Sequence, residues 1–461
     1  MRAWERGAFF GVAVCSGMYD HDHIALGRRN VWGGERPFFM ALPDRRQHTY
    51  VVGKTGTGKS SFLLNLIYQD IHAGRGVGVI DPHGMLADDV LACVPKWRAE
   101  DVVYFNPGDV EHPIAWNLLT VEDGTLKELV VSEMLGAFKS IWRDSWGPRL
   151  EYILEGCLKT LLECENVSLL GVSRLLGDRE YRRWAVKQVK DPGLSAFWRD
   201  EFEQYPENYL REAIGPIQNK VGKFMLSPVI RNIFGQVRSK VGARFMMDNR
   251  RIFITDLAKG TIGEDKANLL GALLVTQFYQ AALARRNMPE EEREDFHLVI
   301  DEVQSFATDS FEKMLSETRK FRLSLTLSHQ YIGQLTEELQ KAAFGNVGTI
   351  IAFRVDQGGA ETLAREFHYT YRPEVFTGLD NYEICVKPLL YGEEGEPFVG
   401  KTFPPDFVRY GRSDKIIKRS RERYTMPRVV VEDKLRRWMQ VTEKPRRRNG
   451  LRRKTHHIID L

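Results

Sequence analysis

Eight consecutive residues, Gly53-Lys54-Thr55-Gly56-Thr57-Gly58-Lys59-Ser60, have the types and spacing of a phosphate-binding loop. Glycines let successive backbone N–H groups turn toward a phosphate, and the N-terminus of a following helix adds positive potential. Lys59 can reach the β- and γ-phosphates, and the Ser60 hydroxyl can bind Mg²⁺. A glycine-rich turn that binds nothing is the alternative. We predict ATP and Mg²⁺ as cofactors, with nucleotide-binding residues Gly53, Thr55, Gly56, Thr57, Gly58, Lys59, Ser60 and Ser61.

Two acidic residues, Asp301 and Glu302, follow the apolar run of residues 296–300. A site that hydrolyses a nucleotide needs a second segment besides the phosphate-binding loop, and an apolar strand that ends in two acids can supply it. Asp301 would hold Mg²⁺, usually through water, and Glu302 would polarise the attacking water as general base. Alone the pattern is weak, because many buried strands end in an acid. Its place after a phosphate-binding loop in the same chain favours Ser60 and Asp301 as metal residues.

Polar residues at two later strand ends complete the predicted catalytic set of Lys59, Glu302, Gln330 and Arg354. Gln330 can sense the γ-phosphate or position the water. Arg354 can stabilise transferred-phosphate charge in a neighbouring subunit. A strand-terminal hydrogen bond is the alternative for Gln330, and a surface position is the alternative for Arg354. Arg319 and Arg322 compete with Arg354 for this role.

Two further segments lie where they can approach a nucleotide. Asp81-Pro82-His83-Gly84 follows an apolar run, at the carboxyl edge where open α/β sheets bind ligands. His48 precedes the first core strand, and it is either near the nucleotide or a hydrogen-bonded structural histidine.

The surrounding sequence predicts an α/β protein with a mostly parallel sheet, because strand-like and helical runs alternate. Residues 1–47 form a short N-terminal region, 48–119 the first part of the nucleotide-binding core, and 248–405 its second part. Residues 120–247 are largely helical and read as an insertion. The last expected strand is 383–389, and 406–461 form a basic C-terminal tail. The strand-like runs are residues 49–52, 76–81, 102–105, 251–257, 296–300, 323–328, 346–354 and 383–389.

Composition is that of a globular protein, with 43% hydrophobic and 28% charged residues. The net charge of +4 is unevenly distributed: residues 412–454 carry 17 Lys and Arg against 5 Asp and Glu, a net +12, which leaves −8 (4 − 12) on the remainder. A basic tail on an acidic body indicates nucleic acid or another polyanion, and a solvated tail is the alternative.

Cysteine usage and hydropathy predict a cytoplasmic protein. The five cysteines are scattered, with no metal-ligand spacing, which favours reduced thiols. No stretch approaches the ~20 apolar residues of a membrane helix, so any membrane association would be made through a partner.

The ordered motifs resemble the HerA/FtsK-type P-loop motor ATPases, and within them the TraG/TraD-like conjugative coupling proteins, in a form without a membrane span. The resemblance implies a RecA-like P-loop NTPase core, a homo-oligomeric ring that is usually hexameric, and ATP-driven DNA translocation through a central channel. It also implies an arginine contributed across the subunit boundary, for which Arg354 is the best match. The motifs that carry it lie in residues 53–60, 81–84, 219–236, 299–302, 329–330, 345–349 and 353–354.

Membrane-anchored coupling proteins carry N-terminal transmembrane helices, which we do not expect here, and HerA proteins usually begin with a sizeable β-barrel, for which the region before His48 leaves little room. The alternatives to a DNA translocase are an ATPase subunit of a defence or DNA-end-processing complex with a nuclease partner, a nucleotide-gated assembly scaffold, and a protein-remodelling ATPase. A secretion or conjugation partner fits the hypothesis of a DNA translocase.

Overall fold

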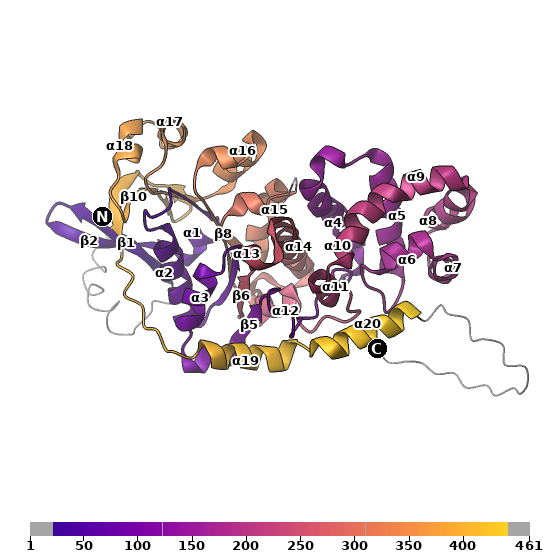
Figure 1. Cartoon of the computed structure of the whole chain (residues 1–461). Coiled ribbons are helices and arrows are strands. Elements are labelled where there is room, and N and C mark those ends of the chain that lie inside the picture. Colours follow the sequence, from indigo (N-terminus) through magenta and orange to yellow (C-terminus); the bar gives the residue numbers. More distant parts are fainter. Residues whose placement is uncertain (1–21, 122, 309, 441–461) are drawn as a thin grey trace, which may run out of the picture. The chain divides into compact units, whose positions relative to one another are not determined.

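The computed structural model describes residues 22–121, 123–308 and 310–440, and it divides into two compact units (Figure 1). One unit comprises residues 22–106 and 243–420, and the other comprises residues 107–242 and 421–440. The first contains the sheet and every predicted site residue. The second is helical.

The first unit is built on an eleven-stranded sheet in the order β2-β1-β13-β10-β9-β3-β8-β7-β4-β6-β5. The strands from β9 to β5 are parallel to their neighbours, whereas β10, β13, β1 and β2 pair antiparallel. The eleven strands are β1 (His23–Val31), β2 (Gly34–Ala41), β3 (Thr49–Val52), β4 (Gly76–Asp81), β5 (Val102–Phe105), β6 (Ile252–Asp256), β7 (Phe296–Ile300), β8 (Leu323–His329), β9 (Thr349–Ala352), β10 (Glu383–Lys387) and β13 (Phe398–Thr402). A separate two-stranded sheet pairs β11 (Leu389–Leu390) with β12 (Glu393–Glu394).

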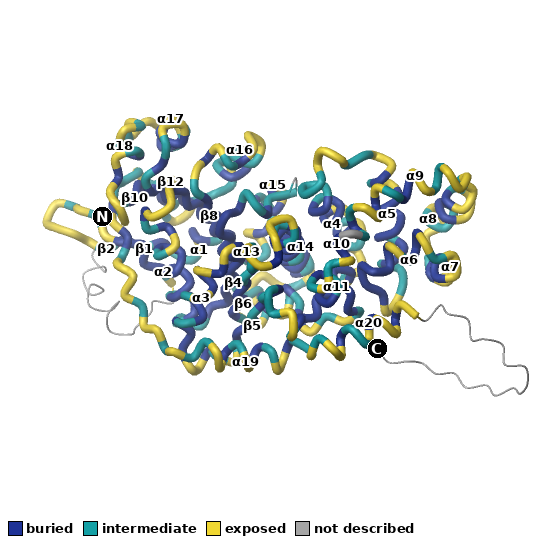
Figure 2. The backbone as a smooth tube through the Cα atoms, in the orientation of Figure 1, coloured by how far each residue is buried: buried dark blue, intermediate teal, exposed yellow. Residues whose placement is uncertain are grey.

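The central parallel strands are buried on both faces. Every residue of β3, β4, β7, β8 and β9 is buried, which accounts for their near-continuous apolar sequences (Figure 2). Because β8 lies between β3 and β7, the carboxyl ends of these three strands meet at one edge. This arrangement brings the segments after Val52, Ile300 and His329 together.

The antiparallel side of the sheet extends beyond the expected elements. Residues 383–389 were expected to be the last strand, but β13 follows β10 and joins it to β1. β1 and β2 form a hairpin at the sheet edge, in a region where the sequence indicated only short strands or packing segments.

Helices cover the sheet of the first unit. They are α1 (Leu42–Arg45), α2 (Lys59–His72), α3 (Met85–Ala92), α12 (Ala243–Asp248), α13 (Lys259–Ile262), α14 (Glu264–Leu283), α15 (Phe311–Glu317), α16 (Glu337–Asn346), α17 (Gln357–Glu366) and α18 (Pro373–Gly378). The segment Glu264–Asn287, which contains α14, is long and apolar enough to cross a membrane by length and composition, contrary to the expectation that no segment would be, and 83% of its apolar window is buried inside the protein.

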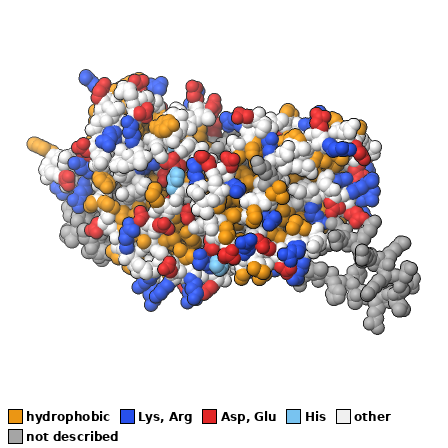
Figure 3. Space-filling view, viewed as in Figure 1, with side chains coloured by type: hydrophobic (Ala, Val, Ile, Leu, Met, Phe, Trp, Pro, Cys, Tyr) orange, Lys and Arg blue, Asp and Glu red, His pale blue; other side chains and the backbone are white. Residues whose placement is uncertain are grey.

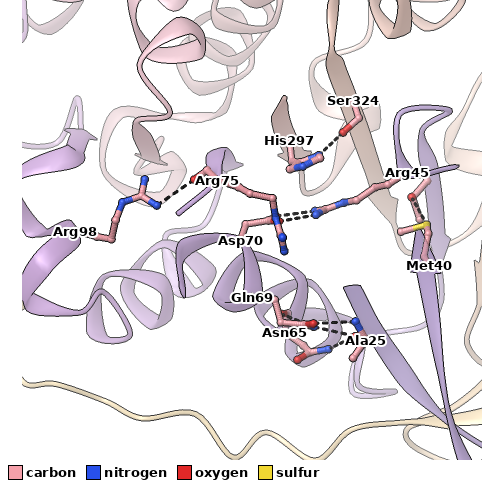
Figure 4. Close-up of polar contacts among 11 residues, drawn as sticks. Ala25, Met40, Arg45, Asn65, Gln69, Asp70, Arg75, Arg98, His297 and Ser324 are labelled. Carbon is pink, nitrogen blue, oxygen red and sulfur yellow. Dashed lines mark hydrogen bonds and ion pairs between the residues drawn. The ribbon is translucent and has the colours of Figure 1, made fainter. Parts of the chain in front are cut away.

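A buried ion cluster fixes the far end of α2 (Figure 4). The Arg45 guanidinium donates two hydrogen bonds to the carboxylate of Asp70, at 2.6 and 2.7 Å, and Arg75 donates a third at 2.8 Å. Burial opposes ionisation of Asp70, but the positive charges around it outweigh burial and lower its pKa. Nearby, the buried ring of His297 contacts the Ser324 hydroxyl at 2.6 Å, and burial lowers the pKa of His297 to about 3.

The second unit consists of helices around an apolar core. A buried hydrogen bond of 2.6 Å runs from the indole of Trp198 to the hydroxyl of Thr160. The helices are α4 (Lys127–Ile141), α5 (Pro148–Glu163), α6 (Gly171–Gly177), α7 (Arg179–Val186), α8 (Pro192–Ala196), α9 (Glu207–Ile217), α10 (Lys223–Leu226), α11 (Pro228–Phe234) and α20 (Arg428–Gln440).

The described part of the basic segment folds into α19 (Ser413–Tyr424) and α20, and the division between the units falls within α19. Several of its arginines pair with acids of the unit to which they belong. In the first unit Arg409 pairs with Asp89 at 2.7 Å, and in the second Arg421 pairs with Asp109 at 2.6 Å. Basic and acidic side chains are interspersed over the face shown in Figure 3. Part of the positive charge of the basic C-terminal tail is therefore already paired with acidic residues of the same chain.

The described cysteines, Cys93, Cys157, Cys164 and Cys385, are all free thiols. Burial raises the pKa of Cys93 to about 11, so this thiol stays protonated at neutral pH.

Candidate active site

The loop between β3 and α2 is shaped by left-handed glycines and a buried threonine. Gly56 and Gly58 have φ angles of 81° and 109°, a conformation that favours glycine. The Thr57 hydroxyl donates a 2.7 Å hydrogen bond to the carbonyl of Lys54, which closes the turn from inside. A Cβ at Gly58 would come within 2.6 Å of the Tyr382 ring, so this ring fixes the outer side of the loop.

The loop presents donors suited to a phosphate. Within the described residues, the backbone N–H groups of Thr55, Gly56 and Gly58 have no hydrogen-bond partner. Ser60 is exposed and Ser61 partly exposed in the first turn of α2, whereas Lys59 is buried. Unpaired N–H groups at the start of a helix attract anions. These residues therefore fit a nucleotide phosphate, with the Ser60 hydroxyl accessible to a cation.

Asp301 faces this loop from the end of β7. Its carboxylate lies 3.7 Å from the Lys59 ammonium and accepts a 2.8 Å hydrogen bond from the Ser328 hydroxyl. Burial raises the pKa of Asp301, and Lys59 and Ser328 offset only part of that effect. The negative charge of Asp301 is thus incompletely compensated, which is the environment in which a divalent cation is stabilised.

Glu302 occupies a strained position beside Asp301. Its φ angle is 52°, in the left-handed region that non-glycine residues seldom adopt. The side-chain amides of Gln330 and Gln304 both donate hydrogen bonds to its carboxylate. Burial opposes ionisation, but these two donors and the charge of Lys59 outweigh it and lower the pKa of Glu302. Glu302 is therefore held as a carboxylate, the form that a general base requires.

Gln330 joins the loop to Glu302. Its amide nitrogen donates to Glu302 at 2.7 Å, and its amide oxygen accepts from the Thr55 hydroxyl at 3.2 Å. The two segments it connects follow different strands, β3 and β7, and Gln330 itself follows β8 between them. A shift of Thr55 on phosphate binding would therefore reach Glu302 through one side chain.

A buried tyrosine and histidine support the backbone at Gln330. The His329 ring donates from Nδ1 to the carbonyl of Tyr331 at 3.0 Å, so its Nε2 accepts from the Tyr50 hydroxyl at 2.5 Å. Burial lowers the pKa of His329 to about 4, so the ring is neutral at physiological pH. The Gln334 side chain accepts from the N–H groups of Gln330 and Tyr331 at 3.1 and 3.2 Å.

Asp81 shapes the loop after β4. Its carboxylate accepts hydrogen bonds from the N–H groups of His83 and Ala87, at 2.8 and 3.0 Å. A Cβ at Gly84, whose φ is 87°, would come within 2.6 Å of Asp256, so the turn requires glycine. This loop leaves His83 exposed at the same edge.

The three arginines considered for stabilising the transferred phosphate do not all lie at the same edge of the sheet. Arg354 follows β9 at the carboxyl edge and donates to the carbonyl of Leu379 and the side chain of Asn381, at 3.2 and 3.1 Å. Arg319 and Arg322 precede β8 and so lie at the amino edge. Arg354 alone of the three shares an edge with the phosphate-binding loop.

His48 is structural. It is fully buried, accepts from the N–H of Leu325 at 3.0 Å and donates to the carbonyl of Leu315 at 2.8 Å. Burial lowers its pKa to about 4. His48 lies at the amino end of β3, so it does not approach the loop.

Five contributors to the site were not predicted: Ser328, Tyr50, Tyr382, Gln304 and Gln334. Ser328 could have been proposed from its place beside His329 and Gln330 at a strand end. Tyr50 and Tyr382 carry no such signal, because each is defined by a partner hundreds of residues away in sequence.

No group of three or more His, Cys, Asp or Glu side chains among the described residues is arranged to hold a metal ion. A nucleotide-bound Mg²⁺ does not require such a group, since it takes one or two protein oxygens and completes its coordination with phosphate and water. Ser60 and Asp301 fit that smaller requirement.

The sequence matches no family model and no curated protein. Solved structures do resemble the fold. The plasmid coupling protein TrwB in complex with ADP and Mg²⁺ matches with a TM-score of 0.60 at 16% identity, over 84% of this chain and 92% of that chain. VirB4 of Thermoanaerobacter pseudethanolicus matches with a TM-score of 0.55 at 17% identity, over 84% of this chain and 97% of that chain.

The chain therefore has the fold of TrwB and VirB4. The predicted RecA-like architecture, with its mostly parallel sheet and helical insertion, is confirmed. At these identities the likeness concerns the fold, and the activity is a separate question.

Proposed function

We propose that this protein is an ATP-driven DNA translocase that works as a homo-oligomeric ring, with six subunits as the expected number. The observation that carries the proposal is the Thr55–Gln330–Glu302 connection, at 3.2 and 2.7 Å, because it links phosphate binding to the general base. Both TrwB, described as a conjugative coupling protein, and VirB4 have this fold, which supports a motor of the coupling-protein type.

Each residue has a distinct task in this proposal. ATP and Mg²⁺, when bound, supply the phosphoanhydride to be cleaved and the charge that offsets its negative oxygens. The loop N–H groups and Lys59 hold the phosphates, and Ser60 and Asp301 hold the cation. Glu302 accepts a proton from the attacking water, and Gln330 orients that carboxylate. Arg354 acts across the boundary between subunits.

The test is ATP hydrolysis by the purified full-length chain, alone and with single- or double-stranded DNA, with Glu302→Gln as the blank. Stimulation by one DNA form supports the translocase and identifies its track. Turnover that neither DNA form changes contradicts translocation on DNA. Co-purification with a nuclease would instead place the ATPase in a defence or DNA-end-processing complex, and dependence on a membrane secretion partner would place it in conjugation.

One observation favours a second function, a nucleotide-gated scaffold. Arg409, Arg421 and Arg428 of the basic segment are already paired with Asp89, Asp109 and Glu111. These arginines are therefore less available to DNA than the net charge suggests. A scaffold would hydrolyse ATP slowly and at a rate indifferent to DNA.

A further inference from the structure

The β1–β2 hairpin carries a tryptophan at its tip. β1 and β2 are joined by a turn in which Gly33 and Gly34 have φ angles of 105° and 116°. Trp32, just before these glycines, is fully exposed, and the half of the hairpin nearest the tip is also largely exposed (Figure 2). The arm projects from the edge of the sheet in Figure 1. An indole held in water on a defined turn is available for stacking.

Two arginines lie opposite each other beside this tip, next to an ion pair of 3.9 Å between Arg28 and Glu35. Arg29 and Arg36 are directly opposite each other in the antiparallel register. Like charges at opposed positions destabilise a strand pair, and a polyanion that contacts both arginines would relieve this repulsion. The Arg29 guanidinium lies 4.5 Å from the Phe398 ring centroid, which orients it, and Arg36 is exposed with no ion pair among the described residues.

The base of the hairpin is fastened to the helix that begins at the phosphate-binding loop (Figure 4). The Ala25 N–H donates to the side chain of Gln69 at 2.8 Å, and the Ala25 carbonyl accepts from Asn65 and Gln69 at 3.0 and 2.9 Å. Both partners belong to α2, whose first residues are Lys59 and Ser60. Displacement of α2 on nucleotide binding would therefore move the hairpin.

We propose that the β1–β2 hairpin binds single-stranded nucleic acid, with a base stacked on Trp32 and phosphates contacted by Arg29 and Arg36. The proposal rests on the proposed function and names a contact for its track. A single strand fits better than a duplex, because only unpaired bases offer their faces to an exposed aromatic ring. It fits better than a second copy of the chain, because opposed arginines favour a phosphate backbone over a protein surface of mixed charge.

The first experiment measures fluorescence anisotropy of a labelled oligo-dT strand with the full-length chain and no nucleotide. We expect Trp32→Ala to weaken binding roughly five- to a hundredfold, the range for loss of one base–aromatic stack. Trp32→Phe should retain most of the affinity, since it keeps an aromatic face. Trp97→Ala is the matched control, because Trp97 is a 59% exposed tryptophan of the same unit, away from the hairpin. Wild-type affinity in Trp32→Ala would overturn the proposal.

Salt dependence tests the arginines separately. Arg36→Gln should make the slope of log Kobs against log salt shallower by about 0.7, the value for one single-strand phosphate contact. An unchanged slope would contradict the phosphate contact. A loss confined to duplex DNA, or a fall in oligomer mass for Trp32→Ala, would overturn the proposal in favour of a duplex or a subunit contact.

The two proposals fail in different ways. ATP hydrolysis without DNA should be unchanged in Trp32→Ala and Arg36→Gln, because neither residue touches the nucleotide site. A wild-type chain that hydrolyses no ATP but binds oligo-dT through Trp32 would contradict the proposed motor and support the hairpin site. If DNA stimulates ATP hydrolysis by the wild type and the stimulation is unchanged in Trp32→Ala, the result would support the proposed motor and contradict the hairpin site.

Discussion

Two buried aspartates lie near opposite ends of helix α2, and their surroundings differ. Asp70, in its last turn, receives three hydrogen bonds from Arg45 and Arg75 at 2.6–2.8 Å. Asp301 faces the first residue of the helix, Lys59, at 3.7 Å and receives one hydrogen bond from Ser328. The pKa of Asp70 is lowered despite complete burial, whereas burial raises the pKa of Asp301.

This difference separates a structural charge from a functional one. At Asp70 the positive charges of the arginines outweigh the effect of burial, so the carboxylate is stable without a further ligand. At Asp301 one lysine and one hydrogen bond compensate the carboxylate only in part, a pattern typical of sites that receive a charged ligand. The same helix thus has one end fixed by an ion cluster and the other at the site where we propose that a nucleotide binds.

The largest effect on ATP turnover should come from substitution of Glu302, the proposed general base beside the phosphate-binding loop. Glu302→Gln keeps the shape of the side chain and one acceptor oxygen for the Gln330 and Gln304 amides, but it cannot accept a proton, so ATP turnover should fall about 10²–10⁴-fold. Lys59→Ala should abolish turnover through loss of phosphate binding. Steady-state hydrolysis measures both, and circular dichroism confirms the fold. Wild-type turnover in either variant would refute the site.

Asp70→Asn should lower the stability of the protein, because Asp70 belongs to the ion cluster that fixes the last turn of α2. It leaves two buried arginines without a counter-charge, so the free energy of unfolding should fall by about 3–5 kcal/mol. Asp301→Asn should change it by no more than ~1 kcal/mol, because the ionised carboxylate is poorly compensated there. Urea denaturation measures the free energy of unfolding of both variants. Equal losses in the two would contradict the proposed difference between Asp70 and Asp301.

The stability that Asp70 provides should depend on pH. Since its folded-state pKa lies below the unfolded value of about 3.9, the contribution is present above that pH and is lost as pH falls through the folded-state pKa. The gap in unfolding free energy between wild type and Asp70→Asn should therefore be constant near neutral pH and narrow below about pH 4. Denaturation curves across this range test it, and a gap that widens on acidification would contradict the assigned sign.

Gln330→Ala should have a smaller effect than loss of the base. Glu302 would keep its hydrogen bond from Gln304 but lose its connection to Thr55, and we expect about a tenfold fall in kcat, equivalent to one hydrogen bond made in the transition state. The KM for ATP should change little. A raised KM with unchanged kcat would instead make Gln330 a binding residue.

Tyr50→Phe should have the smallest effect. It removes the hydroxyl that donates to His329 at 2.5 Å and so loosens the backbone at Gln330. The loss of one buried hydrogen bond should cost about 1 kcal/mol of stability and lower kcat several-fold. Phe344, whose ring packs on Tyr50, offers Phe344→Leu as a packing control that leaves the hydroxyl in place. Equal kcat losses in both would show that packing alone matters.

The parts of the site that local sequence predicts are those whose chemistry follows from neighbours in the chain. The phosphate-binding loop has a fixed spacing, and Asp301 and Glu302 end a continuous apolar run, so both could be placed on their strands. Gln330 was placed because parallel strands end at one edge. Their assigned roles stay predictions until the variants are measured.

Other features depend on distant partners and left no local signal. The register that opposes Arg29 to Arg36 depends on a hairpin in a region of weak strand pattern. β13 joins the sheet through β10 and β1, which no local periodicity indicates. Arg45 finds Asp70 across 25 residues, and either residue alone resembles an ordinary surface charge.

The most direct test of the proposed nucleotide site is calorimetric binding of a non-hydrolysable ATP analogue, with and without Mg²⁺, to the wild type, Asp301→Asn and Lys59→Ala. We predict that Mg²⁺ strengthens binding to the wild type but not to Asp301→Asn, and that Lys59→Ala binds weakly in both conditions. Equal Mg²⁺ enhancement in the wild type and Asp301→Asn would contradict the claim that Asp301, compensated only in part, receives a cation.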